Sequence, residues 1–268
     1  MPLFTSKKVI FVIASAALAG SMLFATGCGD ALIYAKETRG QGMALYNEGN
    51  YGDAAATFAN ATRQDPRDYK SYYFMGASYE AQRAYQQAIS AYRTCLDVMP
   101  LTLEGKSNIS FRYHTIDSLA TAISKSETSS QEAASLERKC KAKASVEDQW
   151  LLAKVCRYSG DADAAIDAYN KAVLIAPDNF TIAKEAGLYE QELGQNNRAT
   201  FALKKAFAVN PDDPQVNDAL RKLGVVAGSG SSESDLAQPA QPMSQGAAWD
   251  ARPRPAAAET ANFQVPRD

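Results

Sequence analysis

Histidine is almost absent from this chain of 268 residues, which contains only His114. A metal site built from several histidines is therefore excluded. An excess of positive charge is also missing, because 28 Lys and Arg residues face 30 Asp and Glu residues and give a formal net charge of −2. Nucleic-acid-binding domains usually carry a basic surface. We therefore expect no nucleic-acid partner.

The usual sequence patterns of catalysis are missing as well. The chain has no glycine-rich phosphate loop and no serine in a nucleophile-elbow pattern. No cysteine or serine can be assigned to His114 as a nucleophile. Asp161 and Asp163 lie at an expected helix start, where they complement the helix dipole without any acid–base role. We expect a protein that is not an enzyme and uses no cofactor, no metal and no small-molecule substrate; an active site around His114 is the least favoured alternative.

The N-terminal apolar run is too short for a typical membrane span. Val9 to Phe24 contains 16 uncharged residues, whereas a transmembrane helix needs roughly 20. Lys7 and Lys8 precede this run, and three small residues follow it at positions 25–27. This order is typical of an export signal, so residues 1–27 are predicted to be a cleaved signal peptide.

Residues 24–28 read Phe-Ala-Thr-Gly-Cys and resemble the lipobox of bacterial lipoproteins. They depart from the usual motif at Ala25, where leucine is common. The resemblance implies that Cys28 receives a diacylglyceryl group and becomes the first residue of the mature chain, with 28–34 as anchor and lead-in. Two or more acyl chains would then hold the protein durably on a membrane. The alternative is ordinary secretion after Gly27, which leaves Cys28 as a free thiol.

Four segments of 34 residues share one pattern when they are aligned on a proline near their ends. The segments are 35–68, 69–102, 146–179 and 180–213. The aligned prolines are Pro66, Pro100, Pro177 and Pro211. Each proline follows an expected second helix and prevents its continuation.

Small residues recur where two helices of such a segment must approach closely. The eighth place holds Gly42, Gly76, Ala153 and Gly187, and the twentieth holds Ala54, Ala88, Ala165 and Ala199. The twenty-seventh place is also small, with Ala61, Cys95, Ala172 and Ala206. The twenty-fourth place instead holds a large residue, which is Phe58, Tyr92, Tyr169 or Leu203. Glycines at positions 49, 160 and 194 suit the end of each first helix, where left-handed backbone is needed.

This pattern resembles the tetratricopeptide repeat (TPR) family over about half of the chain. The resemblance implies an all-α fold in which helical hairpins stack into a right-handed α-solenoid with a concave groove. Residues 35–102 would form repeats 1 and 2, and residues 146–213 would form repeats 3 and 4.

The remaining segments are assigned by their composition. Apolar residues in 103–145 recur at helical spacing, which predicts a degenerate hairpin inserted between repeats 2 and 3. Residues 214–226 begin with proline and carry an apolar stripe, so they are predicted to be a capping helix. Residues 227–268 are rich in Ala, Pro, Gln and Ser, and we expect a disordered tail.

Three cysteines follow the signal segment and Cys28: Cys95, Cys140 and Cys156. Cys95 and Cys156 occupy repeat places that normally face the core, where cysteine behaves as a small apolar residue. Because an exported protein can form disulfides, a bridge is also possible, and Cys140 with Cys156 is the more plausible pair.

In the TPR family, the first helix of each repeat lines the groove. Carried over by position, this implies a protein-binding groove whose residues are Arg39, Met43, Tyr46, Lys70, Tyr73, Glu80, Trp150, Lys154, Arg157, Tyr158, Lys184 and Leu188. The mixture of aromatic and cationic side chains suits a peptide or helix with apolar anchors and some acidic groups. For Tyr73 and Trp150, groove lining and packing against the insert or a neighbouring helix both remain open.

The resemblances together predict a membrane-anchored TPR lipoprotein that faces the periplasm or cell exterior. It would act as a protein–protein interaction adaptor or assembly scaffold in the bacterial cell envelope, with a protein or peptide ligand in the concave groove. The alternative is an exported TPR module without lipid that regulates a cell-wall or secretion enzyme.

Overall fold

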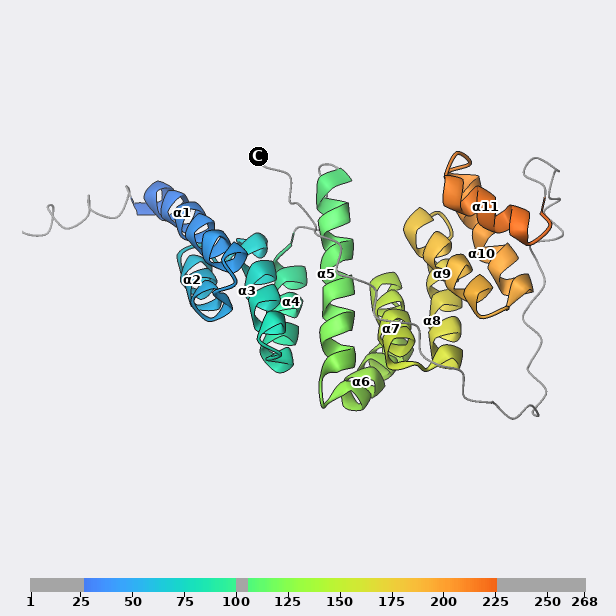
Figure 1. Ribbon diagram of the computed structural model, residues 1–268, viewed down its shortest axis with the longest axis horizontal. Helices are drawn as coiled ribbons and strands as arrows, with labels where there is room; N and C mark the ends of the chain where they lie inside the picture. The colour runs from blue at the N-terminus through green and yellow to red at the C-terminus, as the bar shows by residue number, and fades with distance from the viewer. Residues whose placement is uncertain (1–26, 100–105, 226–268) are drawn as a thin grey trace, which may run out of the picture. The chain divides into compact units, whose positions relative to one another are not determined.

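The computed structural model describes residues 27–99 and 106–225 (Figure 1). Residues 1–26 of the predicted signal peptide, the predicted tail at 227–268, residues 100–105 and the side chain of Cys28 lie outside the described residues. Within the described residues the chain is helical and contains no strand. The helices are α1 (Gly27–Asn47), α2 (Tyr51–Gln64), α3 (Tyr69–Ala81), α4 (Tyr85–Val98), α5 (Lys106–Lys125), α6 (Ser129–Ala142), α7 (Val146–Ser159), α8 (Ala162–Ile175), α9 (Phe180–Glu192), α10 (Asn196–Val209) and α11 (Pro214–Lys222).

Four helical hairpins correspond to the four repeated segments: α1 with α2, α3 with α4, α7 with α8, and α9 with α10. Each hairpin closes on the small residue at the eighth place. A Cβ atom added to Gly76 would lie 2.7 Å from the ring of Tyr92, sixteen residues later. The equivalent approach at Gly187 is to Leu203, at 2.6 Å. The recurring small residues therefore set the closeness of the paired helices, as the sequence pattern predicts.

The turns inside the hairpins use left-handed backbone. Gly160 ends α7 with a φ of 82°, a conformation that glycine adopts at little cost. In the second hairpin the equivalent place is taken by Arg83, with a φ of 59°. This turn therefore forms without the glycine that the other three hairpins use.

The helices that open repeats 2 to 4 and the final helix begin with side-chain caps. Asp68, Asn179 and Asp213 each accept a hydrogen bond from a backbone N–H in the first turn of the helix that follows. Ser145 does the same for α7. These caps satisfy amide groups that have no partner within the helix.

The inserted segment forms two helices, as its apolar spacing predicts, but they do not close like the other hairpins. α5 packs between α4 and α7, whereas α6 packs more on α7 than on α5 (Figure 1). An ion pair of 2.6 Å between Arg93 on α4 and Glu132 on α6 ties the second helix back to repeat 2. The insert thus continues the array through α5 alone.

Both ends of the described array are helical. α1 begins at Gly27, so the segment 28–34, expected to be a lead-in, is helical. At the other end α11 begins with Pro214 in its first turn and buries Val216, Ala219 and Leu220. α11 contacts α9 and α10 and so covers the apolar face of the last hairpin.

Cys95, Cys140 and Cys156 are buried and free. The bridge considered between Cys140 and Cys156 is therefore not formed: Cys140 packs from α6 and Cys156 from α7, each as a small core residue. Burial raises the pKa of Cys156 to about 11, which keeps this thiol protonated at neutral pH and unreactive.

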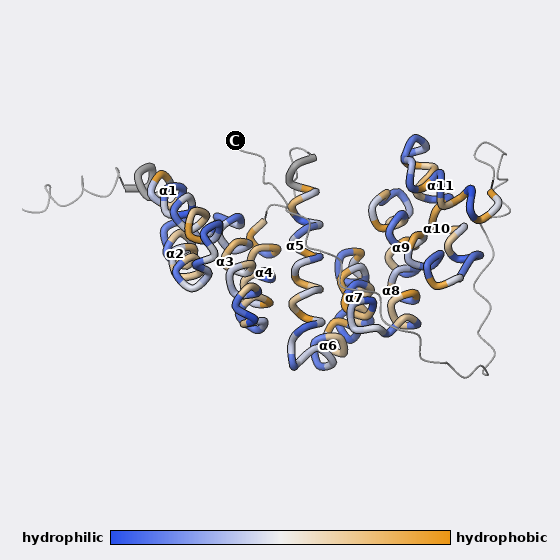
Figure 2. Tube along the Cα trace, viewed as in Figure 1, coloured by the Kyte–Doolittle hydropathy of each residue, from blue (hydrophilic) through white to orange (hydrophobic). Residues whose placement is uncertain are grey.

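Hydrophobic and hydrophilic residues alternate along the helices instead of forming one long apolar stretch (Figure 2). Among the residues searched, none of the helices has the length and apolar character needed to cross a bilayer.

Candidate protein-binding site

The predicted groove residues lie on the first helices of the four repeats. Arg39, Met43 and Tyr46 are on α1, and Lys70, Tyr73 and Glu80 are on α3. Trp150, Lys154, Arg157 and Tyr158 are on α7, and Lys184 and Leu188 are on α9. α5 lies between α3 and α7, so two groups of candidate residues result, one on each side of the insert.

Two of the predicted groove cations bind the N-cap residue of the helix that follows their repeat. Arg39 pairs with Asp68 at 2.6 Å, and Lys184 pairs with Asp213 at 2.8 Å. Both pairs join residues 29 positions apart. Burial alone would raise the pKa of Asp213, but the bond from Lys184 and the backbone N–H groups of the cap lower it. These inter-repeat ion pairs therefore use two cations that the sequence assigned to a ligand.

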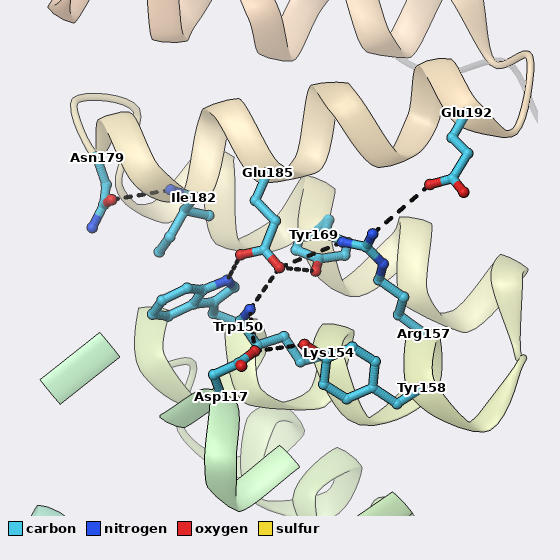
Figure 3. Close-up of polar contacts among 10 residues, drawn as sticks. All are labelled: Asp117, Trp150, Lys154, Arg157, Tyr158, Tyr169, Asn179, Ile182, Glu185 and Glu192. Carbon is cyan, nitrogen blue, oxygen red and sulfur yellow. Dashed lines mark hydrogen bonds and ion pairs between the residues drawn. The ribbon is translucent and has the colours of Figure 1, made fainter. Parts of the chain in front are cut away.

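A carboxylate on α9 collects several donors from α7 and α8 (Figure 3). Glu185 accepts hydrogen bonds from Trp150 Nε1 at 2.9 Å and Lys154 Nζ at 2.6 Å. Tyr169 on α8 donates its hydroxyl to the same carboxylate at 2.8 Å. Arg157 adds an ion pair at 3.6 Å. We call this group the Glu185 cluster; it joins repeat 3 to repeat 4.

The same cluster reaches the insert through Asp117 on α5. Lys154 pairs with Asp117 at 2.9 Å, and Tyr158 donates its hydroxyl to Asp117 at 2.5 Å. Burial raises the pKa of Tyr158, and the neighbouring carboxylate of Asp117 raises it further. The pKa of Asp117 is lowered overall, because Lys154 and the bond from Tyr158 outweigh its burial. These directions keep the donor protonated and the acceptor ionised at neutral pH.

The sequence did not identify Glu185 or Asp117 as part of the site. The signal available was an acidic residue on α9 facing the cations of the preceding repeat, at a place that is not usually counted among groove positions. Neither partner is recognisable from one repeat alone, because each bond crosses from one repeat or from the insert to its neighbour.

Trp150 packs against the insert and does not line an open groove. Its side chain is 1% exposed, and its ring meets Tyr113 of the insert edge-on, with 4.8 Å between centroids. With Lys154 also buried, the candidate residues on α7 mostly hold the array together. Tyr158 stays partly exposed, and Leu188 is half-buried.

On the other side of the insert, the candidate residues are aromatic and less engaged with charge. Tyr73 meets Phe74 edge-on at 5.3 Å and Phe111 at 4.9 Å, and Tyr46 meets Phe74 at 6.1 Å. Tyr46, Tyr73 and Met43 are all half-buried. We call these three residues the aromatic surface. Burial raises the pKa of Tyr46 and Tyr73, so both hydroxyls are protonated at neutral pH; that of Tyr73 lies 3.5 Å from Ser118 Oγ of α5.

Glu80 borders the aromatic surface. It accepts a hydrogen bond from Tyr92 at 3.1 Å and pairs with Lys125 of α5 at 3.2 Å. Lys70 is half-buried on the first turn of α3. The polar groups here stand at the edge of the aromatic side chains, which is the usual arrangement of a protein-binding surface.

A separate hollow of about 670 Å³ results from the departure of α6 from α5. Its walls come from α4, α5, α6 and α7 and include Leu96, Ile116, Leu119, Leu136 and Leu151. Ion pairs at its edge join Arg93 to Glu132, Arg112 to Glu147 and Lys139 to Asp148. None of the predicted groove residues lines this hollow.

Two parts of the chain match sequence models of the tetratricopeptide repeat, at residues 39–97 and 149–179. These segments are tetratricopeptide repeats. The first spans most of α1 to α4 and the second covers α7 and α8, so three of the four predicted repeats are recognised directly. The fold class predicted from the sequence, an all-α solenoid of TPR hairpins, is confirmed.

Solved TPR structures are similar to this chain at low identity. YrrB, described as a TPR protein with an unusual peptide-binding site, is 18% identical, with 69% of this chain and 90% of that chain covered and a TM-score of 0.37. TTC0263, a thermophilic TPR protein from Thermus thermophilus, is 15% identical, with 70% and 98% covered and a TM-score of 0.41. MamA from Desulfovibrio magneticus RS-1 is 17% identical, with 67% and 97% covered and a TM-score of 0.38. No curated protein matches the chain.

Proposed function

We propose that this protein is a membrane-anchored TPR lipoprotein that acts as an adaptor or assembly scaffold for other proteins in the bacterial cell envelope. TPR repeats generally mediate protein–protein interactions, which supports the binding role. The export signal and the lipobox-like residues 24–28 support the anchor at Cys28 and a location facing the periplasm or cell exterior.

The aromatic surface carries this proposal. Tyr46 and Tyr73 offer large, rigid rings with polar tips, the chemistry most often found at the centre of protein interfaces. The alternative surface on α7 and α9 has Trp150 buried and Lys154 and Lys184 already paired with carboxylates. An acidic ligand there would have to displace intramolecular partners. The ligand is therefore a peptide or helix that docks apolar anchors on α1 and α3.

Crosslinking in native membranes tests the binding role. A photo-crosslinking residue at Met43 or at the neighbouring Asn47 should capture the same envelope protein. Tyr46→Ala should weaken that capture, since truncating a central interface aromatic typically costs about 2 kcal/mol or more, roughly 30-fold in affinity. Leu193, which is exposed between α9 and α10, serves as the control position. Equal capture from Leu193, or no effect of Tyr46→Ala, would contradict a specific site.

Mass spectrometry of the mature N-terminus tests the anchor. We expect a chain that begins at Cys28 and carries the mass of two or three acyl groups, as the lipoprotein resemblance implies. A mature chain with an unmodified thiol at residue 28 would favour the exported module without lipid.

A further inference from the structure

The first helix extends beyond the helix that it pairs with. Thr38 on α1 bonds to Gln64, the last residue of α2, with 3.0 Å between the two side-chain oxygens. Residues 27–37 of α1 therefore extend from the end of α2, and among their described side chains, at 33–37, that of Ala35 is buried. At a rise of about 1.5 Å per residue these residues form a projection roughly 16 Å long, visible at the blue end of the chain in Figure 1.

Two large apolar side chains of this projection are exposed. Ile33 and Tyr34 are each 60% exposed, and the next residue, Ala35, is 2% exposed. Among the described residues, Leu174 is the one large apolar side chain that is more exposed. Because successive helical residues are about 100° apart, Ala35 faces the array while Ile33 and Tyr34 face away from it.

The position of this face in the chain indicates what covers it. Ile33 follows Cys28 by five residues, which is about 7.5 Å along a helix axis. A diacylglyceryl group on Cys28 would place this turn at the level of the lipid headgroups. Tyrosine favours this zone, because its ring is apolar and its hydroxyl remains hydrated. Lys36 is also exposed and can reach phosphate groups with its long side chain.

We propose that the projection of α1, through Ile33, Tyr34 and Lys36, lies in the headgroup region of the phospholipid bilayer and orients the repeats on the membrane. This inference rests on the proposed lipidation of Cys28. A second copy of the chain is a weaker candidate, because two side chains fall far short of the roughly 1,200 Å² that a stable interface buries.

The orientation has a consequence for the partner. Met43 on the aromatic surface follows Ile33 by ten residues on the same helix, so at most about 15 Å of helix separates them. A ligand bound at the aromatic surface is therefore held close to the membrane, which suits a juxtamembrane segment of another envelope protein.

Fluorescence quenching in vesicles tests the proposal. The acylated full chain would carry Tyr34→Trp and Trp249→Phe, leaving the buried Trp150 as an internal reference, and would be reconstituted in phosphatidylglycerol–phosphatidylethanolamine vesicles containing brominated lipid. An interfacial segment lies roughly 5–10 Å below the surface, so the tryptophan at position 34 should lose most of its emission. The matched control keeps Tyr34 and carries Leu193→Trp with Trp249→Phe. The tryptophan at position 193 should keep its emission.

Each outcome decides the question. Quenching at position 34 alone supports the proposal. An acylated chain whose position 34 is no more quenched than position 193 overturns the membrane contact and leaves the lipoprotein proposal intact. A chain without acyl groups at Cys28 by mass spectrometry overturns both. Protection of position 34 that depends on protein concentration and persists without lipid would show self-association and overturn the bilayer contact.

Discussion

Glu190 on α9 has a fully buried carboxyl group. Its side chain is 0% exposed, and neither carboxylate oxygen has a hydrogen-bond partner of ordinary geometry. Burial raises its pKa from 4.5 to about 7, and Arg198 on α10 and Asn170 on α8 only partly oppose this. The pKa of this carboxyl group therefore lies close to neutral pH.

A pH dependence of stability follows. In the unfolded chain Glu190 ionises near its ordinary pKa of 4.5, whereas in the folded chain it stays protonated up to about pH 7. The folded state binds more protons in this interval, so its stability should fall as pH rises from about 5 to about 7, by up to about 3 kcal/mol. Glu190→Gln should remove this loss in urea unfolding at several pH values. The exposed Glu192→Gln is the control, and an unchanged slope in Glu190→Gln would disprove the assignment.

Substitution of two helical glycines, Gly76 and Gly40, by alanine should have opposite effects on stability. A Cβ at Gly76 would meet the buried ring of Tyr92 at 2.7 Å, whereas nothing lies within 4 Å of a Cβ at Gly40. Gly76→Ala should destabilise the protein by about 1–2 kcal/mol, because overpacking exceeds the gain in helix propensity. Gly40→Ala should stabilise it by about 0.5–1 kcal/mol. Denaturant midpoints measure both, and stabilisation by Gly76→Ala would show that the hairpin tolerates a wider spacing.

At the scale of elements, the Glu185 cluster should act as the joint between α7 and α9. Glu185→Ala removes the closer of the two carboxylates paired with Lys154, whose side chain is 7% exposed, and leaves Asp117 as the remaining one. Removing the partner of a buried charge costs about 3 kcal/mol when the charge is left unpaired, so with Asp117 in place we expect a smaller loss, about 1–2 kcal/mol. We expect faster amide hydrogen exchange in α9 and α10 and a lower unfolding midpoint.

The exposed pair of Lys171 and Asp167 on α8 provides the comparison. Lys171→Ala should change stability by less than about 0.5 kcal/mol. If the two variants proved equally stable, the Glu185 cluster would have no role in joining the repeats.

The hairpins were predictable because their closest contacts repeat at one spacing. Gly42 with Phe58 and Gly187 with Leu203 are both sixteen residues apart, so a single chain displays the pattern several times. The open form of the insert was not predictable, since whether α6 packs on α5 or on α7 depends on neighbours outside the segment. The roles of the site residues were not predictable for the same reason. The sequence shows a cation at a groove position in the same way whether its partner is a ligand or a carboxylate in the next repeat.

At the scale of the whole described chain, contacts are mostly between successive helices, so disturbances should stay local. Ending the chain after Asn210 removes α11 and exposes the face that Val216, Ala219 and Leu220 bury. Hydrogen exchange should then accelerate in α9 and α10 and remain unchanged in α1 to α4. Ending the chain after residue 226 is the control, because it keeps α11. Loss of protection throughout the array would instead show that the repeats unfold as one unit.

The ion pairs Arg39–Asp68 and Lys184–Asp213 have a consequence for how such an array can grow. Each joins the fifth place of one repeat to the last residue of that repeat, 29 positions later, which caps the helix that follows. A tandem duplication of residues 180–213 would therefore add a second ion pair of this kind, because the lysine of each copy would pair with the aspartate at the end of that copy. Insertion of whole 34-residue repeats therefore preserves these ion pairs. Insertion or deletion of part of a repeat would leave the lysine or the aspartate of a pair without its partner.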